Sequence, residues 1–176
     1  MAHQHEQRAD LAGEHALTDI GQLIGVIIFL AVWAIDSFII RLTTFPDTLV
    51  PVFIRAPITA ALMVLAGVMA WVSHRIIFTE RRDPPSVITT SFFRFVRHPL
   101  YLSEIIIYLG LFILTCSLAC LPVIIAVVIF LNHVAGAEEK LLEKRFGRRY
   151  LEYKQSTGKW FPNLRRMFSD AQKKER

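Results

Sequence analysis

The sequence lacks the motifs by which soluble enzymes commonly bind nucleotides, metals and acyl groups. Its eight glycines are scattered, and it has neither a Gly-x-Gly-x-x-Gly fingerprint nor a Walker-type phosphate loop. No Cys/His spacing is typical of zinc, and no Ser-His-Asp constellation stands in a recognisable context. The two cysteines, Cys116 and Cys120, indicate no disulfide framework. The sequence therefore argues against a Rossmann domain, and we expect no metal site.

Apolar residues dominate what is present. They make up 53% of the chain, and the mean hydropathy is +0.42, which is more apolar than an ordinary soluble domain. Four apolar runs, at 20–40, 56–78, 100–115 and 118–135, have about the length needed to cross a membrane. A tight turn around Ser117 and Pro122 would let the last two runs cross as a hairpin. The fold class predicted is all-α: a multi-pass transmembrane helical bundle of about four crossings with a cytosolic C-terminal helical tail.

The distribution of charge predicts the orientation of the bundle. The formal net charge is +5, and the basic residues flank the apolar runs, so anionic lipid headgroups explain them better than nucleic acid does. The central loop at 79–98 and the tail after Ala137 hold nearly all the Arg and Lys, which places both, and the N-terminus, in the cytoplasm. The small size fits a bacterial inner membrane protein, with an endomembrane location as the alternative. The oligomeric state is not indicated.

The chain divides into four predicted parts. Residues 1–19 form a polar N-terminal tail, residues 20–78 the first two membrane spans, residues 79–162 a core of loop, helix hairpin and cytosolic helix, and residues 163–176 a mobile basic tail. In the core, the tail helix is expected to continue from the fourth span, because Leu142, Phe146, Tyr150 and Tyr153 recur at helical spacing.

Polar and aromatic residues gather at the two ends of the hairpin. The segment 97–101, Arg-His-Pro-Leu-Tyr, precedes a stretch in which Glu104 is the only charged residue up to Leu131, and Glu138-Glu139 follows that stretch. Arg and His can hold a carboxylate, an acidic pair can hold ribose hydroxyls or an ammonium, and aromatic faces can cradle a sulfonium. S-adenosylmethionine presents all of these groups. On residue types alone, however, membrane-interface anchors and a solvated Glu pair are the commoner interpretation.

Residues 91–162 resemble the C-terminal half of the isoprenylcysteine carboxyl methyltransferase and phospholipid methyltransferase superfamily, whereas the first ninety residues match it only in being two spans. The matching residues are Arg97-His98-Pro99-x-Tyr101, Glu138-Glu139-x-x-Leu142, Phe146-Gly147, Tyr150, Tyr153 and Pro162.

The resemblance implies that the core is a methyltransferase core and that S-adenosylmethionine is the cofactor. The residues expected to bind it are His98, Tyr101, Glu138, Glu139 and Tyr150. Arg97 is assigned to a carboxylate of cofactor or substrate and counted among the catalytic residues.

The chain also departs from the family pattern. Ser91 and Ser103 stand where the family usually has glycine, and Asn132-His133-Val134 replaces an Arg that would suit a prenylcysteine carboxylate. His133 is a partial substitute for that Arg. If the acceptor needs a base, Glu104 and His133 are the nearest candidates, and both join Arg97 as predicted catalytic residues.

The resemblance thus implies methyl transfer from S-adenosylmethionine to a lipophilic, membrane-borne acceptor: an isoprenylcysteine-like carboxylate, a phospholipid or another small lipophilic molecule. The expected partners are this acceptor and membrane lipids, with no nucleic acid. Two alternatives remain open from the sequence. One is an NADPH-dependent membrane reductase of the sterol-reductase type, and the other is a non-catalytic membrane scaffold.

Overall fold

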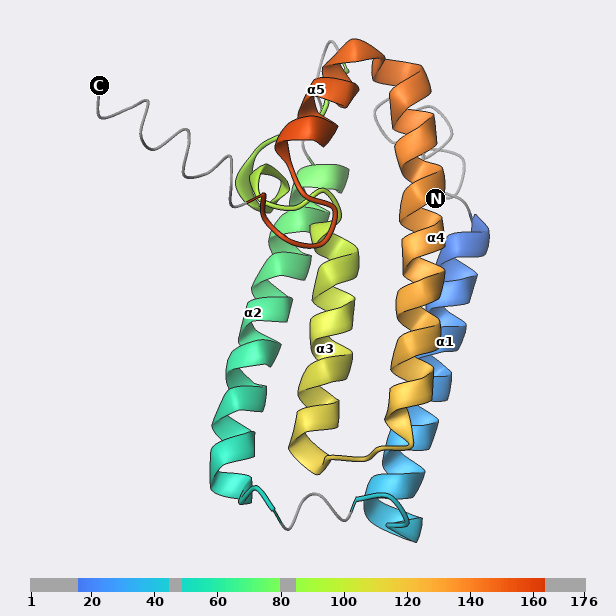
Figure 1. The fold of residues 1–176 in the computed structure, drawn as a ribbon, viewed down its shortest axis with the longest axis vertical. Coiled ribbons are helices and arrows are strands. Elements are labelled where there is room, and N and C mark those ends of the chain that lie inside the picture. Colours follow the sequence, from blue (N-terminus) through green and yellow to red (C-terminus); the bar gives the residue numbers. More distant parts are fainter. Residues whose placement is uncertain (1–15, 45–48, 80–84, 164–176) are drawn as a thin grey trace, which may run out of the picture.

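The computed structural model describes residues 16–44, 49–79 and 85–163. Most of the predicted N-terminal tail and nearly all of the predicted mobile tail lie outside these residues. Over the described ranges the elements are helical, and extended pairing is limited to one isolated bridge between Val96 and Gly158. The elements in chain order are α1 (Ala16–Ala34), the π-helix η2 (Ile35–Ile40), α2 (Val52–Phe78), the 3-10 helix η4 (Ser91–Arg94), α3 (Pro99–Thr115), α4 (Cys120–Phe146) and α5 (Arg148–Ser156) (Figure 1).

Three helical segments are long and apolar enough to cross a membrane: Thr18–Ile40, Val52–Phe78 and Cys120–Phe146. The apolar α3 has 17 residues, or about 25 Å at about 1.5 Å per residue, which is slightly short of a full span. Large apolar side chains lie on the outside of the bundle, such as Leu23 with 60% and Trp71 with 66% of its surface exposed, as expected for contact with lipid rather than water. The predicted all-α membrane bundle is confirmed.

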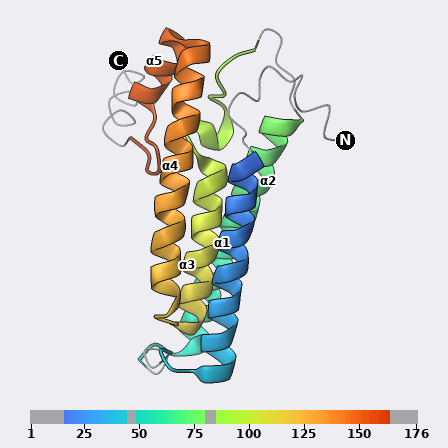
Figure 2. The same ribbon diagram turned by 90° about the vertical axis from the view of Figure 1, so that its right-hand side faces the viewer.

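The bundle is built from two helix pairs. α2 packs along α3, α1 packs along α4, and α1 and α2 make little direct contact (Figures 1 and 2). The α2–α3 approach is close at Gly110, where a Cβ atom would lie 2.5 Å from Cε of Met63. Thr59 Oγ1 donates a hydrogen bond to the Gly110 carbonyl at 3.0 Å, so this pairing is polar as well as tight.

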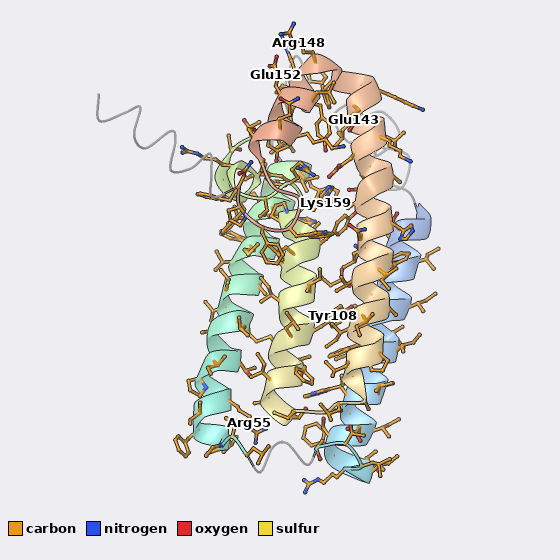
Figure 3. The ribbon with its side chains drawn as sticks, in the orientation of Figure 1. Arg55, Tyr108, Glu143, Arg148, Glu152 and Lys159 are labelled. Atoms are coloured by element: carbon orange, nitrogen blue, oxygen red, sulfur yellow. The ribbon has the colours of Figure 1, made fainter. Side chains whose placement is uncertain are left out.

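The core lies where α1, α3 and α4 meet, and Figure 3 shows Tyr108 midway along it. Tyr108 is 2% exposed, and its ring centroid lies 4.5 Å from that of Phe29. The buried members of this core are Phe29, Tyr108, Cys120, Ile124, Val127 and Leu131.

A buried polar network closes the end of the bundle where α3 turns into α4. Asp36 of η2 accepts hydrogen bonds from the backbone N–H and hydroxyl of Thr43 and from the hydroxyl of Ser117. Nearby, Arg55 of α2 donates to the carbonyls of Val50 and Leu114. These bonds satisfy buried backbone groups at the turn and tie the ends of α1 and α2 to it.

The C-terminal tail does not continue as one helix. α4 extends beyond the apolar run to Phe146 as expected, but Gly147 adopts φ 54° and ψ −128°, a backbone conformation that favours glycine. The chain therefore reverses, and α5 returns toward the start of α3 (Figure 1). The predicted stripe through Tyr150 and Tyr153 along a single helix is wrong, because the break at Gly147 sends these two tyrosines back over the bundle.

Candidate active site

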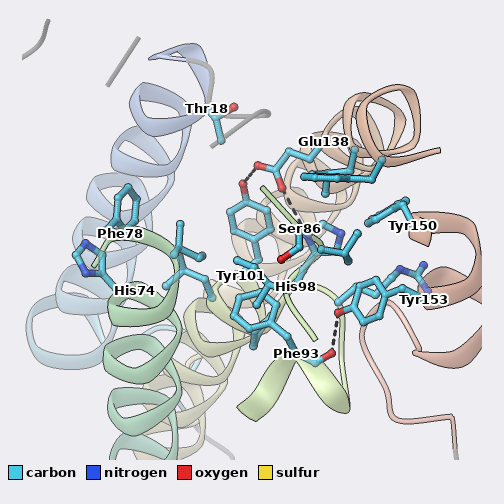
Figure 4. Close-up of a pocket in the computed structure, with 18 of the residues that line it drawn as sticks. Thr18, His74, Phe78, Ser86, Phe93, His98, Tyr101, Glu138, Tyr150 and Tyr153 are labelled. Carbon is cyan, nitrogen blue, oxygen red and sulfur yellow. Dashed lines mark hydrogen bonds and ion pairs between the residues drawn. The ribbon is translucent and has the colours of Figure 1, made fainter. Parts of the chain in front are cut away.

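A cavity of about 360 Å³ lies at the end of the bundle where α3 begins (Figure 4). This volume is within the range of about 300–1,000 Å³ that is usual for small-molecule sites. The cavity brings together residues from five helices and the segment before α3. Its walls are formed by Thr18, Asp19 and Gln22 of α1; His74, Ile77 and Phe78 of α2; residues 86–88, Phe93 and 97–101; Glu138, Leu142 and Phe146 of α4; and Tyr150 and Tyr153 of α5.

One wall of the cavity is a hydrogen-bonded group of three side chains. His98 is the residue before α3, Pro99 presets the first helical turn, and Tyr101 follows in that turn. The Tyr101 hydroxyl donates to Oε1 of Glu138, and His98 Nδ1 lies 3.5 Å from Oε2 of the same carboxylate. The rings of His98 and Tyr101 are stacked, with centroids 5.7 Å apart and planes 10° apart. The start of α3 and the end of α4 are thus fixed to each other.

Glu139 lies behind this wall and is shared by the side chains of Arg97, His98 and Lys154. Its Oε1 lies 3.0 Å from Nε of Arg97 and 3.2 Å from Nε2 of His98, and its Oε2 lies 3.1 Å from Nζ of Lys154. The side chains of Arg97 and Glu139 are only 10% and 7% exposed. Arg97 Nη1 also donates to the carbonyls of Lys154, at 3.1 Å, and Thr157. Arg97 therefore clamps the motif loop, α4 and the end of α5 together.

His98 is held between two carboxylates, which changes its titration. Burial lowers the pKa of His98, but the hydrogen bonds and negative charges of Glu138 and Glu139 outweigh burial, so its pKa is raised above the ordinary 6.5. Each ring nitrogen faces one of the carboxylates, and both can donate only in the imidazolium form.

The two tyrosines of α5 stay protonated. Burial raises the pKa of Tyr150 and of Tyr153 well above the ordinary value of 10.0. Tyr150 is 2% exposed and lines the cavity, and the Tyr153 hydroxyl donates to the Phe93 carbonyl at 2.7 Å. This contact fixes α5 against the segment that leads into α3.

The structure gathers most of the predicted site residues and leaves two of them apart. Glu139 does not line the cavity but bonds to residues that do. Glu104 lies one turn further along α3 and accepts a hydrogen bond from the Tyr108 hydroxyl at 2.7 Å, and His133 is exposed on α4 with Nδ1 3.0 Å from the Ile129 carbonyl. The predicted residues that line the cavity are Arg97, His98, Tyr101, Glu138 and Tyr150.

Sequence reasoning missed the contribution of the first two helices. Asp19 and Gln22 near the start of α1, and His74 near the end of α2, line the cavity together with the motif residues. The only signal in the sequence is that these polar residues stand at the ends of the first two apolar runs. Lys154 was also missed, and its contact with Glu139 depends on the turn at Gly147.

The two serines that replace family glycines do not line the cavity. Ser91 adopts φ 53°, in the left-handed region where glycine is unstrained. Ser103 is 2% exposed, and its hydroxyl donates to the Leu100 carbonyl at 2.6 Å. The left-handed backbone at position 91 therefore gives a physical reason to expect glycine there.

The family model of phospholipid methyltransferases matches residues 57–149, more than half of the 176-residue chain. The chain belongs to the phospholipid methyltransferase family. The match includes both halves of the Tyr101–Glu138 contact and ends just before Tyr150. This family member is an integral membrane protein built on a methyltransferase fold.

Among solved structures, the fold is similar to that of a eukaryotic intramembrane Ras methyltransferase, isoprenylcysteine carboxyl methyltransferase. The TM-score is 0.60 at 20% sequence identity, and the match covers 86% of this chain and 54% of that enzyme. The family member thus spans about half the length of the enzyme it resembles. No curated protein sequence matches this chain.

Proposed function

We propose that this protein transfers a methyl group from S-adenosylmethionine to a lipophilic, membrane-borne acceptor. The observation that carries the proposal is the composition of the cavity. The polar wall of His98, Tyr101 and Glu138 shares the cavity with the apolar side chains of Ile77 and Phe78 of α2, and Figure 4 shows Phe78 on the side away from Glu138. Such a cavity suits a polar cofactor on one side and an apolar acceptor on the other. Family membership and the shared fold support the same reaction class.

The residues of the cavity fit this cofactor chemically. Glu138 offers carboxylate oxygens to ribose hydroxyls or to an amino group. The rings of Tyr101, Phe93 and Tyr150 offer faces to a sulfonium cation. When bound, the cofactor supplies an electrophilic methyl group. The part of this chain is to hold the two reactants in line and to exclude water, which the buried wall around His98 and the cover of α5 support.

We further propose that the cavity faces the cytoplasm, together with both termini. Among the described residues, Arg94 and Arg97 before α3 and the Lys and Arg residues at the end of α4 and on α5 lie at the cavity end of the bundle, and the positive-inside preference assigns this end to the cytoplasmic side. The chain size fits the inner membrane of a bacterium. The cofactor then enters from the cytosol, and the acceptor enters from the bilayer.

Calorimetry on the detergent-purified protein tests the proposal. We expect saturable binding of S-adenosylmethionine and S-adenosylhomocysteine and no binding of NADPH. The Glu138→Gln substitution keeps the shape of the side chain and removes its charge, so it should weaken binding by about tenfold or more, since hydrogen bonds to charged groups contribute about 1.5–3 kcal/mol.

Glu152→Gln is the matched control, because Glu152 is exposed and, among the described residues, forms an ion pair with the exposed Arg148 on α5 alone. Binding of NADPH alone would assign the protein to the membrane reductases, and binding of neither ligand would favour the scaffold. Transfer of labelled methyl groups to total lipid then identifies the acceptor.

A further inference from the structure

The cofactor contacts proposed above do not involve the residues of α1 and α2 that line the cavity. Figure 4 shows His74 and Phe78 on one side, Glu138, Tyr150 and Tyr153 on the other, and Tyr101 with His98 between them. The His74 and Phe78 ring centroids lie 4.4 Å apart, so the imidazole rests on an aromatic neighbour one helical turn away.

This side of the cavity is formed by two helices that are long and apolar enough to cross a membrane. α1 and α2 make little direct contact, yet Gln22 of α1 and His74 of α2 line the same cavity. A lipophilic molecule that enters between these helices meets His74, which is exposed at the rim, before it meets the wall at Glu138.

His74 differs from His98 in what surrounds it. His98 is buried, and its two ring nitrogens face the carboxylates of Glu138 and Glu139. Arg97 is engaged with Glu139 and two carbonyls. Among the described lining residues, His74 is the imidazole on the side of α1 and α2, and histidine is the side chain that most often serves as a general base in enzymes.

We infer that His74 is the catalytic base of the acceptor side, and that the acceptor reacts through an N–H or O–H group rather than a carboxylate. This inference rests on the methyl transfer proposed above. The nucleophilic nitrogen or oxygen forms a bond to the methyl carbon as the carbon–sulfur bond of S-adenosylmethionine breaks, and the electron pair of that bond stays on sulfur. The proton of the nucleophile passes to a ring nitrogen of His74 and then to water. A carboxylate acceptor has no proton to lose and needs no base.

The nature of the methylated product tests the acceptor class directly. The purified protein is incubated with methyl-labelled S-adenosylmethionine and total membrane lipid, and the product is treated with alkali. A methyl ester releases volatile labelled methanol, whereas an N-methyl or O-methyl ether product keeps its label. We expect alkali-stable label, and alkali-labile label would overturn the inference.

Two variants test His74 itself. His74→Ala should lower the transfer rate by about 100-fold or more, as expected for loss of a general base. Added imidazole should restore part of the rate, which it would not do if the variant were merely misfolded. Glu152→Ala, which removes an exposed side chain of α5 that pairs with Arg148 outside the cavity lining, should transfer at the wild-type rate.

Binding of S-adenosylhomocysteine separates this inference from the proposed function. We expect His74→Ala to bind it as the wild type does, because His74 lies across the cavity from Glu138. Wild-type transfer by His74→Ala, or a lost rate that imidazole does not restore, would refute the role of His74 and leave the proposed function standing. Absence of cofactor binding and of any labelled product in the wild type would refute both.

Discussion

Arg97→Lys tests whether the motif arginine holds the helices together or binds a ligand. The substitution keeps a positive charge near Glu139 but removes the planar fork that also donates to the carbonyls of Lys154 and Thr157. These bonds connect the motif loop to the end of α5, and the Arg97 side chain is only 10% exposed. Loss of the fork should therefore loosen α5 from the bundle.

The size of the effect follows from the bonds lost. Two hydrogen bonds from a charged donor contribute about 1.5–3 kcal/mol each, so the free energy of unfolding should fall by about 3 kcal/mol or more. For a chain of this length that is a fall in the unfolding temperature of about 6–12 °C. The measurement is thermal unfolding of the purified protein in detergent, followed by circular dichroism.

The matched control is Arg148→Lys on α5. The Arg148 side chain is 91% exposed, and its pair with Glu152 joins residues four apart on one helix, so the unfolding temperature should not change measurably. An Arg97→Lys protein that unfolds at the wild-type temperature but binds S-adenosylhomocysteine more weakly would show that Arg97 serves the ligand and not the fold. The clamp argument would then be wrong.

Two further predictions follow from the backbone and from titration. Ser91→Gly should raise the free energy of unfolding by about 0.5–1 kcal/mol. It removes the strain of a left-handed serine, about 1–2 kcal/mol, and the greater freedom of glycine in the unfolded chain offsets part of that gain. Ser91→Ala keeps the strain, so its unfolding temperature should not rise. The pKa of His98 is raised above 6.5, so the stability that its protonated form contributes is fully present below pH 6.5 and is lost as the pH rises through the raised pKa. Unfolding temperatures of the wild type and His98→Gln should therefore differ most in acid and converge in alkali, and a constant gap across this range would contradict the assignment.

The helices of this protein were predictable because hydropathy alone locates membrane spans. The runs expected at 20–40 and 56–78 correspond to the observed spans Thr18–Ile40 and Val52–Phe78. The third run corresponds to α3, and the fourth to the first part of α4. In lipid every buried backbone group must be satisfied within the chain, so a long apolar run has few alternatives to a helix.

The break in the C-terminal tail was harder to predict, because the residue at which the chain reverses is a glycine within a regular helical pattern. Tyr150 and Tyr153 fit the helical spacing of Leu142 and Phe146, and the pattern predicted one continuous helix. Gly147 instead takes a conformation outside the helical region and reverses the chain. Periodicity is the same on both sides of such a break, so the sequence pattern does not reveal it.

The sequence indicated that the motif residues of the two hairpin helices lie close together, but it did not indicate which neighbouring residues of these helices line the cavity. Glu138 and His133 lie five residues apart, which places them about 140° apart around α4, and only Glu138 lines the cavity. Glu104 lies a turn along α3 from Tyr101 and is bonded to Tyr108 instead. Their catalytic assignment stays a prediction. The contribution of His74 depends on how α2 packs on α3, which no local pattern encodes.

The clamp at Arg97 also sets an order of events during synthesis. Its carbonyl partners, Lys154 and Thr157, lie 57 and 60 residues further along the chain, and the backbone N–H of Arg97 donates to the Gly158 carbonyl at 2.9 Å. All the helices of the bundle can enter the membrane before these residues leave the ribosome. A nascent or prematurely terminated chain therefore has its membrane spans without the cover of its cavity, and the protein cannot acquire its assembled site until residues 154–158 have emerged.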